Sequence, residues 1–218
     1  MRSLTVPLKV FIGVDSRQPV AGTVAAHSVA RHSSVPVAIT PLMLHQLPIK
    51  RRGLTEFTFS RFLVPWLCGF KGQAVFMDAD MIVTGDIAEL FGYFPPAVSV
   101  MQEQERFEWA SLMVFNCEAC RVLTPEFVED PKNQLFDLAW AKEVGKLPLE
   151  WSHCVGYASP VHAEKAKLLH FTRGLPVWPE TDDTPEADLW FNEAEIATST
   201  CSYDELMGRS IHHERKTA

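Results

Sequence analysis

The sequence lacks any apolar run close to the roughly 20 residues that a membrane-spanning helix needs. It also lacks a basic surplus: 20 Lys and Arg stand against 27 Asp and Glu, a net charge of −7. This balance argues against broad binding to nucleic acid or anionic membranes, but it leaves room for a local anion site. Residues 1–14 are largely apolar, yet Lys9 interrupts them and no small-residue cleavage site follows. We therefore expect a cytoplasmic protein without a transmembrane segment.

Cysteine is scarce, and its five positions are irregularly spaced in a chain of 218 residues. An odd number of cysteines in a chain of this length does not indicate a disulfide framework. Cys117 and Cys120 form a C-x-x-C, but zinc needs four ligands and no second such pair follows. We expect reduced thiols, with a zinc or redox site at this pair as the alternative.

The chain shows no internal repeat and no linker, and its length suits one domain. Short β-branched and aromatic runs predict strands, and helical spacing of apolar residues predicts helices between them. The predicted strands are 9–14, 36–40, 74–77, 81–83, 97–101, 112–115 and 167–171. The predicted helices are 19–31, 59–70, 87–91, 132–144 and 186–196, and a short segment at 203–207 follows the last of them. This alternation indicates an α/β fold with a mostly parallel central sheet, in a single Rossmann-like domain over 1–208. Residues 209–218 read as a polar tail.

Acidic and imidazole side chains follow several of the predicted strands, where ligands bind in such sheets. Asp15, the pair Asp78 and Asp80, and His170 each come after an apolar run. In an extended chain, side chains two apart point the same way, so Asp78 and Asp80 face one spot. Two carboxylates that close repel unless they share a proton or a divalent cation. The alternative is a turn whose aspartates only cap or face solvent.

His170 and Arg61 are the other candidates for site chemistry. A carboxylate pair with one imidazole suits Mn²⁺ or a similar borderline ion better than Ca²⁺, which prefers oxygen ligands only; Mg²⁺ is the alternative cation. The alternative for His170 is a core histidine, but Arg173 and Gly174 follow it with a cation and a turn. Arg61 interrupts an apolar segment, where its charge must find an anion or a salt-bridge partner.

A series of short motifs resembles the nucleotide-sugar glycosyltransferases of family eight, which include glycogenin and bacterial lipopolysaccharide galactosyltransferases. The motifs lie between residues 9 and 178: Val14-Asp15, the S-R-F of 58–62, the D-A-D-M-I-V of 75–83, Gly85-Asp86-Ile87, Phe115-Asn116 and the segment from His170 to Trp178. The central S-R-F and D-A-D-M-I-V block is the specific part of the resemblance.

The resemblance implies a GT-A fold and a retaining hexosyltransferase that uses a UDP-sugar. It implies that Asp78, Asp80 and His170 hold Mn²⁺, that Asp15 contacts the uridine, and that Arg61 lies on the phosphate side of the donor. The donor site that it implies comprises Val14, Asp15, Arg61, Asp78, Ala79, Asp80, Asn116, Arg173 and Gly174. The acceptor, whether a saccharide, a lipid-linked sugar or a protein, is not identified. Little chain remains to build an acceptor pocket, which leaves a role for a partner or a homo-oligomer.

The sequence departs from the family pattern in its late motif. The glycine after His170 comes one place later than usual, and no lysine follows, so Arg173 is the candidate phosphate cation. The family's Asp-Gln pair is not visible. These departures motivate a second hypothesis, a protein that binds a nucleotide sugar without transferring it.

A third hypothesis is a phosphatase of the haloacid-dehalogenase type, because residues 76–82 approximate the start of that class. It needs a downstream acidic pair after a strand, but the one Asp-Asp doublet, Asp182-Asp183, lies within a proline-bounded loop.

Overall fold

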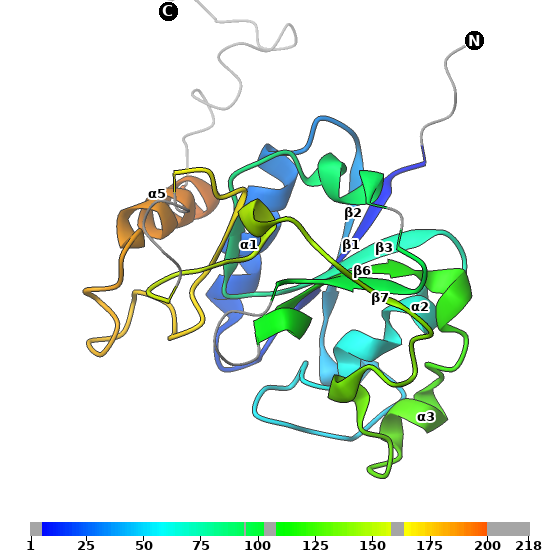
Figure 1. Cartoon of the computed structure of the whole chain (residues 1–218). Helices are drawn as coiled ribbons and strands as arrows, with labels where there is room; N and C mark the ends of the chain where they lie inside the picture. The colour runs from blue at the N-terminus through cyan, green and yellow to red at the C-terminus, as the bar shows by residue number, and fades with distance from the viewer. Residues whose placement is uncertain (1–5, 94, 103–107, 158–163, 200–218) are drawn as a thin grey trace, which may run out of the picture.

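The computed structural model describes residues 6–93, 95–102, 108–157 and 164–199 (Figure 1). The predicted segment 203–207 and the tail 209–218 lie outside these residues. None of the helices in the described ranges is both long and apolar enough to cross a membrane.

Nine strands and four α-helices form the described structure. The strands are β1 Leu8–Gly13, β2 Val37–Leu42, β3 Gln73–Asp78, β4 Met81–Val83, β5 Val98–Val100, β6 Leu112–Asn116, β7 Val144–Lys146, β8 His153–Cys154 and β9 Leu168–His170. The α-helices are α1 Pro19–Arg31, α2 Val64–Leu67, α3 Pro125–Glu129 and α5 Ala187–Thr198. Short 3₁₀ turns cover Leu44–Gln46, Ser60–Leu63, Ile87–Gly92, Glu108–Ser111, Cys117–Cys120, Leu135–Asp137 and Leu149–Trp151.

The central sheet is mixed, with strand order β2-β1-β3-β6-β5-β7. β1 runs parallel to β2 and β3, and β7 runs parallel to β5, whereas β6 is antiparallel to both of its neighbours. The predicted α/β fold with a mostly parallel sheet is thus confirmed. A second, smaller sheet has the order β4-β9-β8 and lies beyond the end of β3.

Two hydrophobic cores lie on opposite faces of the central sheet, which explains why β1 and β3 are apolar throughout. Side chains alternate along a strand, so Ile12 and Met77 enter the core beneath α1, whereas Phe11 and Phe76 enter the other core. That second core contains Phe62, from the turn before α2. Both faces are therefore covered, and polar chemistry is left to the sheet's edges.

Helix α1 matches its predicted range residue for residue. Pro19 occupies the first turn, where its missing N–H costs nothing. Helix α5 packs beside α1 (Figure 1), and the buried carboxylate of Glu193 joins the two helices. Its oxygens lie 2.5 Å from His27 Nδ1 and 2.7 Å from Arg31 Nη1.

Two helix predictions differ from the structure. The predicted helix 132–144 is wrong: residues Leu135–Asp137 form one 3₁₀ turn, Leu138 is left-handed at φ 56°, and the chain then joins the sheet as β7. The predicted helix 59–70 is shorter and divided into a 3₁₀ turn and α2. It ends where Gly69 and Phe70 both adopt positive φ.

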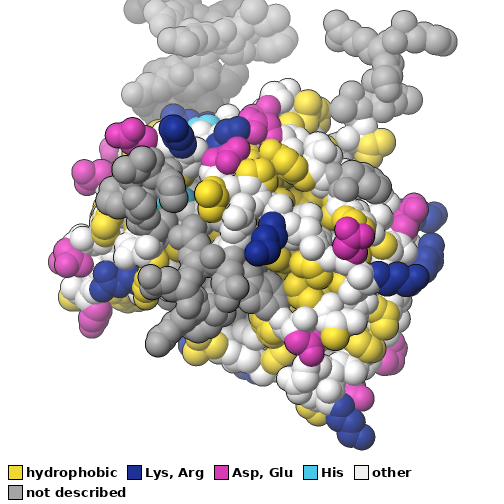
Figure 2. Space-filling model, viewed as in Figure 1, with side chains coloured by type: hydrophobic (Ala, Val, Ile, Leu, Met, Phe, Trp, Pro, Cys, Tyr) yellow, Lys and Arg dark blue, Asp and Glu magenta, His cyan; other side chains and the backbone are white. Residues whose placement is uncertain are grey.

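Charged side chains are dispersed over the face shown in Figure 2. Acidic and basic groups stand singly or in small clusters, with apolar side chains between them. That face offers no broad basic surface to a polyanion, in keeping with the net charge of −7.

Candidate functional site

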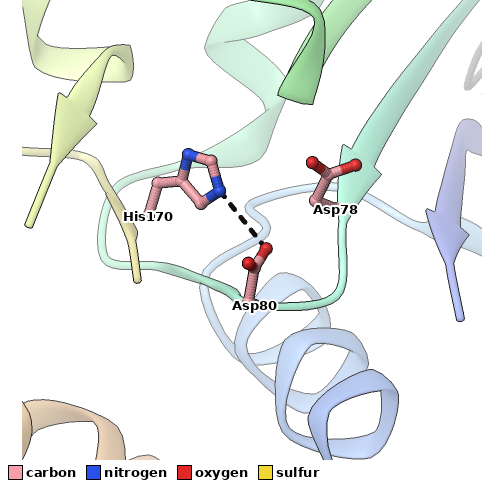
Figure 3. A group of neighbouring side chains, drawn as sticks. All are labelled: Asp78, Asp80 and His170. Atoms are coloured by element: carbon pink, nitrogen blue, oxygen red, sulfur yellow. Dashed lines mark ion pairs between the residues drawn. The ribbon is translucent and has the colours of Figure 1, made fainter. Parts of the chain in front are cut away.

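Asp78, Asp80 and His170 meet at the end of β3, as their strand-end positions predict (Figure 3). Asp78 ends β3, Asp80 lies in the turn that leads to β4, and His170 ends β9. Strand β9 pairs antiparallel with β4 so that His170 lies opposite Met81. One ligand atom from each of the three side chains lies within 4.8 Å of the other two. Among the described residues, no other group of three His, Cys, Asp or Glu side chains comes as close.

Burial and neighbouring charges shift the pKa values of Asp78 and His170. Burial raises the pKa of Asp78 to about 6, against the attraction of Arg61 and with the repulsion of Asp80. Burial alone would lower the pKa of His170, but the charge and hydrogen bond of Asp80 outweigh it and raise that pKa well above its usual value. The Asp80 Oδ1 to His170 Nε2 distance is 3.3 Å. Without a cation, the imidazole thus acts as the positive partner of the carboxylates.

The donor set fits a divalent cation. Oδ1 of Asp78 and Oδ1 of Asp80 are both buried, and their charged neighbours are Arg61 Nη2 at 3.1 Å and His170 Nε2 at 3.3 Å, respectively. The two buried carboxylates repel each other, so a divalent cation between them would be favourable. An imidazole beside two carboxylates suits Mn²⁺ better than Ca²⁺, which prefers oxygen ligands.

Arg61 orients the first carboxylate of this group. Its Nη2 lies 3.1 Å from Asp78 Oδ1, and its other nitrogens donate to the carbonyls of Thr58 at 3.2 Å and Ala110 at 2.6 Å. The guanidinium also stands 4.9 Å from the ring centroid of Phe76. The anionic partner that the sequence predicts for Arg61 is therefore Asp78, a member of the cluster formed by Asp78, Asp80 and His170, here called the metal-type cluster.

Two adjoining cavities open at this edge of the sheet. The first, about 430 Å³, is lined by Arg61, Asp78, Asp80, His170, Ser111 and Phe136 among others. The second, about 230 Å³, is lined by Asp15, Arg17, Ala79, Asp80, Arg173 and Gly174 among others. Asp80, Thr55, Phe57 and Thr172 line both. Seven of the predicted donor-site residues, together with His170, thus line these two adjoining cavities.

Val14 and Asn116 are not brought to this space. Val14 is buried and packs against α1, where it would contact any side chain placed at Gly22. Asn116 pairs with Gln73 at the start of β3, because β6 runs antiparallel to β3. Gln73 and Asp78 are five residues apart on one strand, which separates Asn116 from the cluster by roughly 17 Å.

Arg17 is the principal site residue that the sequence reasoning missed. It forms a two-pronged ion pair with Asp15, with Nε at 2.8 Å from Oδ1 and Nη2 at 2.7 Å from Oδ2. Hydrogen bonding from Arg17 lowers the pKa of Asp15 to about 2. The signal was present as an acid and a base two residues apart at the end of β1.

The fold is similar to the GT-A fold of solved glycosyltransferases. GlyE of Streptococcus pneumoniae TIGR4, a glycosyltransferase, superposes with a TM-score of 0.67 and 13% identity over 87% of this chain, which spans 60% of GlyE. The galactosyltransferase LgtC, solved with donor and acceptor sugar analogues, gives a TM-score of 0.57 and 11% identity over 91% of this chain and 99% of LgtC. At these identities the likeness establishes the fold. No family model matches the chain.

A sequence relative defines the family. Protein CDI of Arabidopsis thaliana is 31% identical over 226 residues, which cover 87% of this chain and 86% of the relative. The chain therefore belongs to the family of Protein CDI.

Proposed function

We propose that the protein is a metal-dependent hexosyltransferase that transfers a sugar from a UDP-sugar to a saccharide, lipid-linked or protein acceptor with retention of configuration. The observation that carries this proposal is the Asp78, Asp80 and His170 cluster at the border of two cavities in a GT-A fold. The resemblance of its motifs to family eight supports the UDP-sugar donor and the retaining outcome. The cytoplasm is the compartment we propose.

Asp78, Asp80 and His170 would hold Mn²⁺ or Mg²⁺. When bound, the ion would neutralise negative charge on the leaving diphosphate. The chain's own part is to present the ligands ready oriented: Arg61 fixes Asp78, and the backbone N–H of Phe171 donates to the carbonyl of Asp80 at 2.9 Å. A preorganised group loses little entropy when its ligand arrives.

Arg173 would contact the donor phosphates in place of the lysine that family eight carries. It lines the second cavity with Asp80 and is followed by Gly174, whose φ of 117° favours glycine. None of the described acidic residues forms an ion pair with Arg173. Its charge is therefore available to an anion beside the cluster.

The phosphatase hypothesis has less support from the geometry. Asp182 and Asp183 are exposed and line neither of the two cavities that contain Asp80. Their carboxylates are therefore not placed to share a cation with the cluster.

The donor and metal are tested by thermal shift and calorimetry with a panel of nucleotide sugars, with and without Mn²⁺. A ligand that binds only the folded state raises the melting temperature. We expect a Mn²⁺-dependent shift with UDP-sugars, and its loss in Asp80→Asn while the fold is retained. Asp183→Asn makes the same charge change at an exposed position and serves as the control. Unchanged donor affinity in Asp80→Asn would refute the metal assignment.

Transfer is separated from mere binding by turnover. A transferase hydrolyses its donor slowly when no acceptor is present, so release of UDP with Mn²⁺ distinguishes it from a protein that only holds the nucleotide sugar. If UDP-sugar binds but no UDP is released with any acceptor class, the binding-protein hypothesis replaces transfer.

A further inference from the structure

The carboxylate of Asp15 has no acceptor capacity left for a ligand. Its Oδ1 accepts hydrogen bonds from the backbone N–H of Arg17 at 3.0 Å and from Arg17 Nε at 2.8 Å. Its Oδ2 accepts from Arg17 Nη2 at 2.7 Å and from the backbone N–H of Glu56 at 3.2 Å. A carboxylate offers about four lone-pair sites, and all four are used. A nucleobase N–H could reach Asp15 only by displacing one of these donors.

The guanidinium of Arg17, in contrast, keeps an unused donor. Nε and Nη2 face Asp15, and Nη2 also donates to the carbonyl of Leu54 at 3.0 Å. Nη1 makes no hydrogen bond to any residue in the described ranges. The side chain is 68% exposed and lines both the second cavity and a neighbouring cavity of about 390 Å³.

The strand register places the loop that carries Arg17 next to the loop that carries Asp80. Gly13 pairs with Asp78 across parallel strands, so Asp15 and Asp80 each lie two residues beyond a paired position. Adjacent strands are about 4.8 Å apart. The second cavity therefore has Asp80 and Arg173 toward the cluster and Arg17 on the β1 side. A nucleotide whose phosphates lie near Asp80 would extend its base toward Arg17.

We propose that Arg17 recognises the nucleobase of the donor by donating from Nη1 to the carbonyl oxygen at position 4 of uracil, and that Asp15 is a positioning residue that fixes the guanidinium. The inference rests on the proposed function and replaces the uridine contact that the family resemblance implies for Asp15. At position 4 of the ring, uracil presents a carbonyl oxygen where cytosine presents an amino group; the carbonyl oxygen at position 2 is common to both bases. A donor-only side chain at this place therefore favours uracil over cytosine.

The surroundings of Arg17 restrict its movement. The two-pronged pairing with Asp15 holds the planar guanidinium in one orientation. The loop that Arg17 contacts through Leu54 is held in turn by Ser16, whose backbone N–H and hydroxyl both donate to the carboxylate of Glu56. A base therefore meets a donor that is already oriented, which limits the entropy lost on binding.

The test compares the dissociation constants of UDP and CDP, measured by calorimetry with Mn²⁺. A charge-assisted hydrogen bond supports a preference for UDP of about tenfold or more in the wild type. We expect Arg17→Ala to reduce this ratio to about one, whereas Arg17→Lys, which keeps a donor, retains part of it. Arg52→Ala, the same charge change at another exposed arginine of the neighbouring cavity, should leave the ratio unchanged.

The opposite result is equally defined. If Asp15 recognises the base, Arg17→Ala frees its oxygens, and the preference for UDP persists or grows. Asp15→Asn should lower the preference for UDP over CDP, because it releases the guanidinium of Arg17. A purely structural defect would weaken the binding of UDP and CDP alike and would leave this preference unchanged. If the wild type binds no UDP with Mn²⁺, the proposed function fails together with this inference. If UDP binds but the preference survives in Arg17→Ala, only the role of Arg17 is refuted.

Discussion

Replacing Asp78 by asparagine should flatten the pH dependence of stability in the metal-free protein. Burial moves the pKa of Asp78 from 3.8 to about 6. Below pH 3.8 the carboxyl is protonated in both states and adds no penalty. As the pH rises, the unfolded chain ionises first, so stability falls until the pH passes about 6. A shift of about 2 units corresponds to a loss of about 3 kcal/mol.

The assay is a series of thermal denaturation curves between about pH 4.5 and 7.5 in the presence of a chelator. Over this pH range about 2 kcal/mol of the loss is sampled, which for a chain of this length corresponds to roughly 4–8 °C in the melting temperature. The informative quantity is the difference in slope between the wild type and Asp78→Asn, because loss of the Arg61 partner also changes the absolute stability. His170, whose raised pKa also favours stability at low pH, remains in both proteins.

Saturating Mn²⁺ should remove much of this slope from the wild type, because a bound cation stabilises the ionised carboxylate. Asp183→Asn, an exposed position, should keep the wild-type slope in the chelator series. If the melting temperatures of the wild type and Asp78→Asn in chelator change with pH in parallel, burial does not raise the pKa of Asp78, and the prediction is refuted.

Two further substitutions test features that support the fold and the site. Glu193→Gln should lower the free energy of unfolding in urea by about 1–3 kcal/mol, because it weakens two charge-assisted hydrogen bonds between α1 and α5. Glu195→Gln, at an exposed position of the same helix, is the control. Equal losses in the two variants would show that Glu193 does not join the helices. Gly13→Ala would place its Cβ 2.6 Å from the ring of Phe57, which lines both cavities. It should weaken nucleotide binding in calorimetry and cost about 1–3 kcal/mol, whereas Gly92→Ala, with no atom within 4 Å, should do neither.

Local patterns predicted the elements whose structure depends on near neighbours. Helix α1 was identified from Pro19 and the small apolar residues that follow it, and both signals act within a turn or two of chain. The convergence of Asp78, Asp80 and His170 was also predictable, because buried strands read as apolar runs and their polar successors mark one edge of the sheet.

The remaining features depend on contacts distant in sequence. The segment 132–144 has helical spacing, but the left-handed turn at Leu138 and the pairing of β7 with β5 decide its structure. Asn116 follows a strand as Asp78 does, yet the antiparallel direction of β6 carries it to the opposite edge. The two-pronged ion pair between Arg17 and Asp15 requires a particular loop conformation, which the spacing of the two residues alone does not specify.

The pairing of β4 with β9 fixes the order of events during synthesis. Both carboxylates leave the ribosome early, whereas His170 comes from the last third of the chain and reaches them only when β9 docks on β4. A nascent chain that ends before β9 would hold the two repelling carboxylates without the imidazole of His170. Tight binding of a cation would thus report that β9 has docked on β4, and chains shortened before β9 would lack the full donor set even if the central sheet forms.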